Sequence, residues 1–439
     1  MPHFTVRFKT FGCKLNQSET AVMARDFLDH GYQAATESES ADVVVINTCT
    51  VTGRSDAKCR QAIRQSLTQN PESTLIVTGC YSQVSTAEIA SIPGVDYVFG
   101  VSEKLGLFDF FPGPGKREVP CVRVTDIQER KDEPIRFAGN YTDRTRAFLK
   151  IQSGCDRRCS YCIVPLARGP SRSLPVDFIL DQADHLIRTG FREVVLTGVH
   201  VGDFGKKGSG TSGLPALLRR LVRLDPAVRW RMSSLDPGDL GDELLHTLAE
   251  YPSICRHFHV ALQSGSDTIL KAMNRRHTTG EFREAVARIR DVLGPVGLGT
   301  DLITGFPDET DQRFEETRRF VESLPFSYFH VFPFSARGGT PAAGMSGQIP
   351  SRVRMERARI LRSIGAAKKQ AFLESFIGKT TEVLFECRKI NGRMGGFTSE
   401  YARVEIPFDP QLVNRIARVR IRNMDGQALT GEILPADAT

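Results

Sequence analysis

The stretch Gly-Cys-Asp-Arg-Arg-Cys-Ser-Tyr-Cys-Ile-Val-Pro occupies residues 154–165 of a 439-residue chain. It places Cys155, Cys159 and Cys162 in a C-x3-C-x2-C spacing. Three thiolates this close in sequence can converge on one soft metal site. A structural metal site normally takes four protein ligands, so three leave one coordination position open for chemistry. The plainer alternative is a zinc knuckle whose fourth ligand lies elsewhere in the chain.

An aromatic residue, Tyr161, stands directly before the third cysteine. The complete pattern resembles the signature of the radical S-adenosylmethionine (SAM) enzymes. The resemblance implies that the three cysteines hold a [4Fe-4S] cluster, that SAM fills the fourth iron position, and that Tyr161 belongs to the cofactor-binding loop. In such enzymes the cofactors carry the hard chemistry, while the protein positions them and excludes side reactions.

Strand-like and helix-like segments alternate six times through the central part of the chain. The expected strands cover residues 147–152, 193–196, 229–233, 257–262, 299–303 and 328–332. This alternation predicts an α/β fold with a partial (β/α)6 barrel over residues 141–371. A barrel carries its active site at the C-terminal ends of its strands, and the three cysteines directly follow the first strand.

Polar or glycine-rich loops follow the other expected barrel strands. Each loop alone is a weak signal, because turns after strands are commonly polar. Together they resemble the SAM-binding face of the radical-SAM barrel. The side chains that we expect to contact SAM there are Gln263, Ser264 and Asp301.

Three short strands precede the barrel, and each is followed by a cysteine. They are expected over residues 3–9, 42–46 and 74–78, with helices over residues 18–30, capped by Ser18, and 55–69. This order predicts an open parallel α/β sheet domain over residues 1–136. The C-terminal ends of parallel strands share one sheet edge, so Cys13, Cys49 and Cys80 are expected to meet there. A single buried cysteine is more often a small core residue, but three equivalent positions indicate a site.

The segments around these cysteines, residues 10–17, 47–52 and 78–80, resemble the N-terminal domain of the methylthiotransferases. The resemblance covers essentially the whole chain and implies that Cys13, Cys49 and Cys80 hold a second, auxiliary [4Fe-4S] cluster. It also implies that SAM serves both as methyl donor and as radical source. The expected partners are an electron donor such as flavodoxin or ferredoxin and the iron–sulfur assembly machinery. Cys59 and Cys121 lie outside these motifs, and we interpret Cys59 as a packing residue of its helix.

The end of the chain is basic and changes to an alternating pattern. Residues 351–422 contain 16 Lys and Arg against 7 Asp and Glu, in a chain of net charge +7. A basic helix over residues 352–372 is expected to return toward the N-terminal domain. Short strands with Asn-Gly and Asp-Gly turns then predict a small antiparallel β-barrel over residues 375–438, and residues 396–401 resemble the TRAM domain, an RNA-binding barrel.

Positive side chains in two places are candidates for RNA contact. On one expected strand of this barrel, Arg418, Arg420 and Arg422 alternate on one face. Near the barrel mouth, the candidates are Arg168, Arg172 and Arg337.

Composition excludes some classes of protein. No apolar stretch is long enough to span a bilayer, and the first residues lack an apolar signal core, so we expect a cytoplasmic protein without membrane association. Ten cysteines in a reducing compartment indicate metal or catalytic roles in preference to disulfides. A monomer is the default expectation.

The motifs around Cys13 and Cys49 look like the branch of the family that acts on N6-threonylcarbamoyladenosine (t6A) beside the tRNA anticodon. That reaction would place a methylthio group on C2 and give 2-methylthio-t6A. The alternatives are the branch that acts on isopentenyladenosine, the branch that modifies an aspartate of a ribosomal protein, and a non-catalytic RNA-binding protein with structural zinc. The basic C-terminal third favours RNA over a protein substrate.

Overall fold

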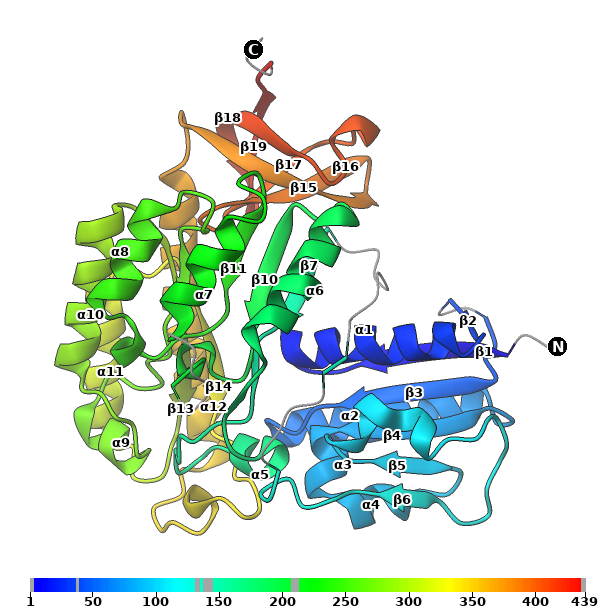
Figure 1. Ribbon diagram of the computed structural model, residues 1–439. Coiled ribbons are helices and arrows are strands. Elements are labelled where there is room, and N and C mark those ends of the chain that lie inside the picture. Colours follow the sequence, from blue (N-terminus) through cyan, green and yellow to red (C-terminus); the bar gives the residue numbers. More distant parts are fainter. Residues whose placement is uncertain (1–3, 37–38, 131–134, 137–144, 207–212, 436–439) are drawn as a thin grey trace.

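The computed structural model describes residues 4–36, 39–130, 135–136, 145–206 and 213–435. The expected junction between the first two domains, residues 137–140, lies outside these ranges. The chain forms three regions, which are an N-terminal sheet, a central set of strands wrapped by helices, and a C-terminal barrel (Figure 1). No helix in the described ranges is long and apolar enough to cross a membrane.

The N-terminal region is a parallel sheet of order β2-β1-β3-β4-β5-β6, as the sequence predicted. Its strands are β1 (Thr5–Thr10), β2 (Gln33–Ala34), β3 (Val43–Thr48), β4 (Thr74–Gly79), β5 (Tyr97–Phe99) and β6 (Cys121–Arg123). Every residue of β3 and β4 is buried, because helices cover both faces. One face carries α1 (Lys14–Asp29) and the 3-10 helix η1 (Glu103–Asp109). The other carries α2 (Gly53–Gln69), α3 (Cys80–Val84) and α4 (Thr86–Ala90).

Helix α1 begins four residues earlier than the sequence suggested. Cys13 is the N-cap residue, and Ser18 lies inside the helix, where its hydroxyl donates to the Leu15 carbonyl at 2.9 Å. The prediction of Ser18 as the N-cap was therefore wrong. The earlier start places Cys13 and Lys14 at the sheet edge where β3 and β4 end.

The central region has six parallel strands in two three-stranded sheets, β11-β10-β7 and β12-β13-β14. A parallel bridge between Leu235 and Val260 joins the two sheets, and the result is the expected partial barrel. Its strands are β7 (Arg146–Lys150), β10 (Glu193–Thr197), β11 (Arg229–Met232), β12 (His257–His259), β13 (Gly297–Thr304) and β14 (Tyr328–Pro333). Short pieces near the cysteine loop are β8 (Gln152–Ser153), α5 (Val164–Arg168), β9 (Arg172–Ser173) and α9 (Asp267–Ala272).

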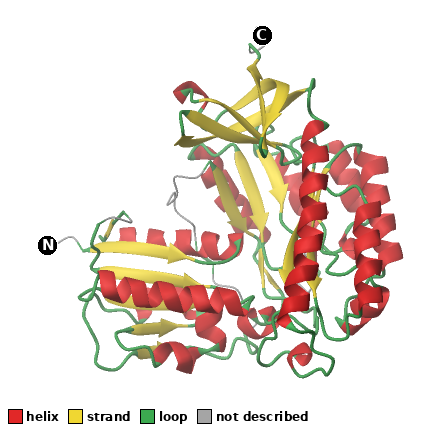
Figure 2. Cartoon of the chain, turned by 180° about the vertical axis from the view of Figure 1, so that it is seen from behind, coloured by secondary structure: helices red, strands yellow, loops and turns green. Residues whose placement is uncertain are grey.

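In the described part of the chain, the helices that connect these strands cover their outer side (Figure 2). They are α6 (Val176–Arg188), α7 (Gly213–Val222), α8 (Asp242–Glu250), α10 (Thr279–Leu293) and α11 (Asp311–Ser323). Outward-facing Val194, Leu196 and Trp230 pack in the core beneath the helices. Side chains alternate along a strand, so Glu193, next to Val194, and Arg231, next to Trp230, face inward.

The basic helix α12 (Ser351–Glu374) does not return to the N-terminal domain, so that expectation was wrong. Its buried residues Ala358, Leu361 and Gly365 lie against the central region, where α12 packs along β14. A Cβ on Gly365 would lie 2.9 Å from the Phe329 ring, which shows how closely the helix approaches the strand. The helix leads from there to the C-terminal barrel.

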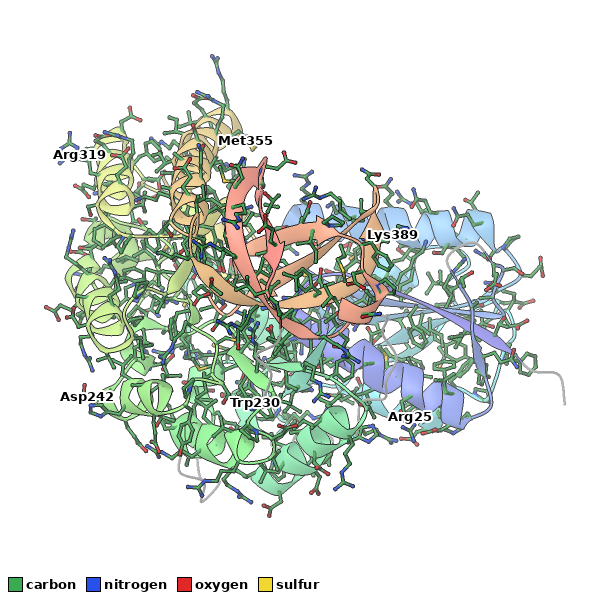
Figure 3. All side chains as sticks on the ribbon, turned by 90° about the horizontal axis from the view of Figure 1, so that it is seen from above. Arg25, Trp230, Asp242, Arg319, Met355 and Lys389 are labelled. Carbon is green, nitrogen blue, oxygen red and sulfur yellow. The ribbon has the colours of Figure 1, made fainter. Side chains whose placement is uncertain are left out.

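The C-terminal barrel is closed in the order β15-β16-β17-β19-β18, and only the β17–β19 pair is parallel. Its strands are β15 (Thr380–Ile390), β16 (Arg393–Thr398), β17 (Arg403–Pro407), β18 (Ile416–Asp425) and β19 (Ala428–Ile433). Asn391 and Gly392 have φ of 50° and 77°, as the predicted Asn-Gly turn requires. Seen from above, this barrel lies over the central strands (Figure 3).

Arg231 anchors the C-terminal barrel to the N-terminal ends of the central strands. Its guanidinium binds Glu193 at 2.7 and 3.1 Å, and both side chains are fully buried. It also donates to the Ser399 carbonyl at 3.0 Å, and it lies over the Tyr401 ring at 4.9 Å. The segment that resembles TRAM therefore faces the central strands.

We expect Glu193→Gln to destabilise the protein, because it leaves the Arg231 charge buried without its partner. Breaking a buried pair in this way costs about 3–5 kcal/mol. The midpoint of thermal unfolding measures the effect. The matched control is Glu315→Gln, which breaks exposed pairs with Arg318 and Arg319 and should change the midpoint little. Equal midpoints for the two variants would contradict this account of the anchor.

Candidate functional site

The three cysteines that follow the N-terminal strands lie at the same sheet edge, as predicted. Gly12 and Gly79 have φ of 96° and 103°, a conformation that favours glycine. A Cβ on Gly12 would lie 2.9 Å from Cys49 Sγ, so the Cys13 turn passes directly over Cys49. Burial, with the neighbouring Cys80 and Cys13 thiolates, raises the pKa of Cys49 to about 12. Cys59 packs in the core behind this edge, as expected.

The second triad lies in the loop between β8 and α5. The Cys155 amide donates to the Gly169 carbonyl at 3.0 Å, and the Ser160 amide donates to the Met273 carbonyl at 3.0 Å. Burial, with the neighbouring thiolates, raises the pKa values of Cys155 and Cys162 to about 12. The loop is thus held by hydrogen bonds at both ends. Its three sulfur atoms lie close enough for each thiolate to affect the pKa of its neighbours.

The spacing of the sulfur atoms bears on the kind of metal site. Among the described residues, neither triad has all three sulfur atoms within 4.8 Å of one another. A zinc ion holds its thiolates at about 2.3 Å, so its sulfur ligands lie closer together than that. The sulfur atoms of neither triad therefore have the spacing that a single zinc ion requires.

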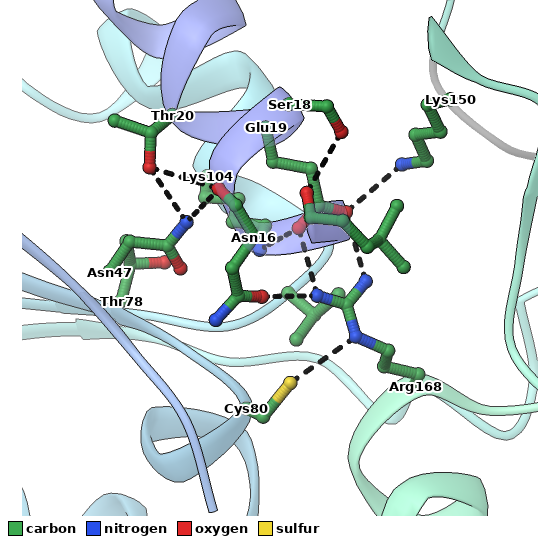
Figure 4. A network of polar contacts seen from close by, with 12 residues as sticks. Asn16, Ser18, Glu19, Thr20, Asn47, Thr78, Cys80, Lys104, Lys150 and Arg168 are labelled. Atoms are coloured by element: carbon green, nitrogen blue, oxygen red, sulfur yellow. Dashed lines mark hydrogen bonds and ion pairs between the residues drawn. The ribbon is translucent and has the colours of Figure 1, made fainter. Parts of the chain in front are cut away.

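A buried network around Arg168 joins the two triads (Figure 4). Arg168 lies on α5, just after Cys162, and its Nε donates to Cys80 Sγ at 3.2 Å. Its other nitrogens bind Glu19 at 2.9 Å twice and Asn16 Oδ1 at 2.5 Å. One side chain thus connects α5, which follows the Cys155–Cys162 loop, to Cys80, a ligand candidate of the N-terminal triad.

Two lysines complete the network. The ammonium groups of Lys104 and Lys150 lie 2.5 and 3.0 Å from the Glu19 carboxylate. Although burial opposes it, Arg168, Lys104 and Lys150 hold the pKa of Glu19 well below its usual range. The network therefore contains one carboxylate and three cations.

The three arginines near the barrel mouth are bound to the chain itself, which corrects their assignment as RNA contacts. Arg168 is 2% exposed and Arg172 is 6% exposed, and Arg172 donates to the Pro170 and Arg168 carbonyls. Arg337 binds Asp56 at 2.5 Å and donates to Thr50 Oγ1 at 2.7 Å. It thereby ties the loop after β14 to the segment that follows Cys49.

The candidates on β18 keep their predicted placement. Arg418, Arg420 and Arg422 are exposed on one face of the strand. Arg422 pairs with the exposed Glu432 at 2.8 Å.

Of the three side chains expected to contact SAM, Gln263 and Asp301 lie together, and Ser264 points elsewhere. Gln263 has φ of 73°, unusual for a residue other than glycine, and its amide donates to the Asp301 carbonyl at 2.9 Å. Ser264 is fully buried, and its hydroxyl lies 3.2 Å from Thr317 Oγ1 on α11. The expectation that its side chain reaches SAM was wrong, because the side chain points into the core. Tyr161 packs against a small core beside its loop.

Further polar groups at the site were not foreseen. The Asp301 carboxylate lies 3.3 Å from His259 Nε2 and 3.2 Å from His330 Nδ1. Arg275 binds Asp236 at 2.5 Å and lies 3.5 Å from Cys159 Sγ. It lines a polar pocket of about 270 Å³ beside Cys159. Asp301 was an expected SAM contact, but no spacing or motif in the sequence singles out His259, Arg275 or His330.

We expect Arg168→Met to loosen the contact between α3 and α5, because it removes the donor to Cys80 and one cation from Glu19. Amide hydrogen exchange of the purified protein should become faster in these two helices. Arg168→Lys keeps the charge but not the planar fork, so its exchange should be intermediate. Arg188→Met, on an exposed pair with Asp184, serves as the control. Unchanged exchange in α3 and α5 would contradict the assigned role.

Comparisons with known proteins agree with this geometry. Residues 149–321 match the radical SAM superfamily, and residues 5–100 match the uncharacterized protein family UPF0004. The threonylcarbamoyladenosine tRNA methylthiotransferase MtaB of Bacillus subtilis is 35% identical over 95% of this chain and 93% of its own. The MtaB of Thermotoga maritima is 33% identical over 97% of this chain and 96% of its own.

Among solved structures, the radical SAM methyltransferase TsrM from Kitasatospora setae has a similar fold. The TM-score is 0.54 at 15% identity, and the match covers 90% of this chain and 80% of that chain. The chain therefore belongs to the radical-SAM tRNA methylthiotransferase family.

Proposed function

We propose that this methylthiotransferase modifies C2 of t6A next to the tRNA anticodon and produces 2-methylthio-t6A. The observation that carries the proposal is the meeting of two cysteine triads, one on the radical-SAM loop and one on the N-terminal sheet edge, joined by Arg168. The nucleoside is the one named for the similar methylthiotransferases of Bacillus subtilis and Thermotoga maritima.

The two triads divide the cofactors between them in this proposal. Cys155, Cys159 and Cys162 hold one [4Fe-4S] cluster and leave its fourth position to SAM, near Tyr161, Gln263 and Asp301. The auxiliary [4Fe-4S] cluster is held by Cys13, Cys49 and Cys80. When bound, the clusters and SAM supply the radical, the methyl group and the sulfur. The chain itself orients these groups and keeps water from them.

No general base is required of the protein, because the C–H bond at C2 offers no acid or base handle and is activated by radical chemistry. Reduction requires an electron donor such as flavodoxin or ferredoxin, and the clusters require the assembly machinery. Such chemistry suits the reducing cytoplasm. The exposed Arg418, Arg420 and Arg422 on the C-terminal barrel contact RNA phosphates and position the tRNA.

Nucleoside mass spectrometry of tRNA from a strain lacking this gene tests the substrate. We expect 2-methylthio-t6A to disappear and t6A to accumulate, and the wild-type gene should restore the product. Loss of the methylthiolated isopentenyladenosine instead would assign the alternative RNA substrate. An unchanged set of tRNA nucleosides would contradict an RNA substrate, and modification of a ribosomal protein aspartate would then be tested.

Metal analysis tests the two-cluster proposal. The anaerobically purified protein should contain about eight iron and comparable sulfide per chain. Cys13→Ala and Cys155→Ala should each reduce the iron to about four. Cys13→Ala should still cleave SAM but should not form the methylthiolated product. Zinc without sulfide would favour the non-catalytic RNA-binding alternative.

A further inference from the structure

Lys14 directly follows Cys13 and is the first residue of α1. Its side chain is half-buried, and within the described part of the chain its ammonium group has no hydrogen bond or ion pair. Buried lysines are normally paired, because removing a charge from water without a partner is costly. Lys14 therefore lacks an anionic partner among the described residues and is available to bind one.

The inward-facing side chains opposite Lys14 do not supply an anionic partner for its ammonium group. The arginines at the N-terminal ends of β7 and β11 each have a glutamate partner, in the pairs Arg146–Glu386 at 3.0 Å, Arg229–Glu382 at 3.2 Å and Arg231–Glu193 at 2.7 Å. Glu193 is held by both ends of the Arg231 guanidinium. Each carboxylate is therefore already engaged by an arginine, and Lys14 remains as the extra positive charge.

The electrostatic environment of Lys14 agrees with this count. The Arg231 and Arg146 guanidinium groups lie close enough to act on the Lys14 charge. The nearby His257 adds no charge, because burial and the same cations hold its pKa well below its usual range. The charged groups close to Lys14 are thus mostly cations.

Exposed side chains lie on two sides of this position. Cys13 is exposed, and the inner side of β14 presents the exposed side chains of His330 and Phe332. Lys14 therefore lies between the candidate auxiliary ligand Cys13 and the inner wall of the central strands.

We propose that Lys14 binds the carboxylate of the threonyl group of the substrate and thereby determines specificity for an acidic N6 substituent. This inference rests on the proposed t6A substrate. In adenine, C2 and C6 flank the same ring nitrogen, so a substituent on N6 begins close to the carbon that reacts. A carboxylate on that substituent can meet a cation adjacent to the auxiliary triad. An apolar isopentenyl group at the same place would leave the ammonium unpaired.

The test compares two anticodon stem-loop RNAs, one with t6A and one in which the threonyl carboxylate is converted to its neutral methyl ester. Binding to the cluster-loaded full chain is measured without SAM, and methylthiolation is measured separately with SAM and reductant. The wild-type protein should bind the t6A RNA about 10- to 100-fold more tightly than the ester, the range expected for a hydrogen bond to a charged group. Lys14→Met should bind both RNAs equally, and Lys14→Arg should retain the preference.

Lys58→Met is the matched control, because Lys58 is an exposed lysine of α2 in the same domain. It should keep the full preference for the carboxylate even if it weakens binding of both RNAs. Iron content and the visible spectrum of Lys14→Met should match wild type, so that lost discrimination is not lost cluster.

The inference is overturned if wild type binds the acid and the ester equally, or if Lys14→Met keeps the preference. These outcomes differ from failure of the proposed function, in which wild type would not methylthiolate the t6A RNA at all. If Lys14→Met loses its cluster, the comparison of the two RNAs on wild type and on Lys14→Arg still decides the question.

Discussion

The buried carboxylate of Glu19 and the cations around it are the interaction on which the site depends. Arg168, Lys104 and Lys150 all lie on this one carboxylate, and Arg168 and Lys104 are buried with it. Removing one partner of a buried ion pair is expensive and costs about 3–5 kcal/mol. Arg168 also donates a hydrogen bond to the Cys80 sulfur. The network thus fixes the helix that follows Cys162 against the edge of the N-terminal sheet.

The central strands use their two ends for different purposes. Their C-terminal ends carry the cysteine loop and meet the N-terminal sheet edge through Arg168 and Arg337. Their N-terminal ends hold the C-terminal barrel through arginine–glutamate pairs such as Arg231–Glu193. The two flanking regions are therefore both fixed to the central strands. Lys14 has no hydrogen-bonding or ionic partner in the described part of the chain.

The sequence predicted what depends on local pattern and on topology. The alternation of strands and helices predicted the parallel strands of the N-terminal and central regions. The rule that parallel strands end at one edge predicted that Cys13, Cys49 and Cys80 meet. What it missed depends on pairing between distant segments. The Arg-Gly-Pro sequence at Arg168 is typical of a surface turn, so it does not predict a buried side chain. Its partner Glu19 lies 149 residues away in the sequence. The path of α12 and the inward turn of Ser264 are likewise decided by tertiary neighbours, which no spacing in the chain reveals. The same holds for Lys14, which has no partner among the described residues.

The central claim is that the two triads hold two clusters close together across the Arg168 contact. Electron paramagnetic resonance of the fully reduced protein tests it most directly. Two reduced clusters that are neighbours interact magnetically, so the wild-type spectrum should be broadened and should differ from the sum of the spectra of Cys80→Ala and Cys159→Ala. A wild-type spectrum equal to that sum, with both clusters present, would contradict the claim that the triads form one site.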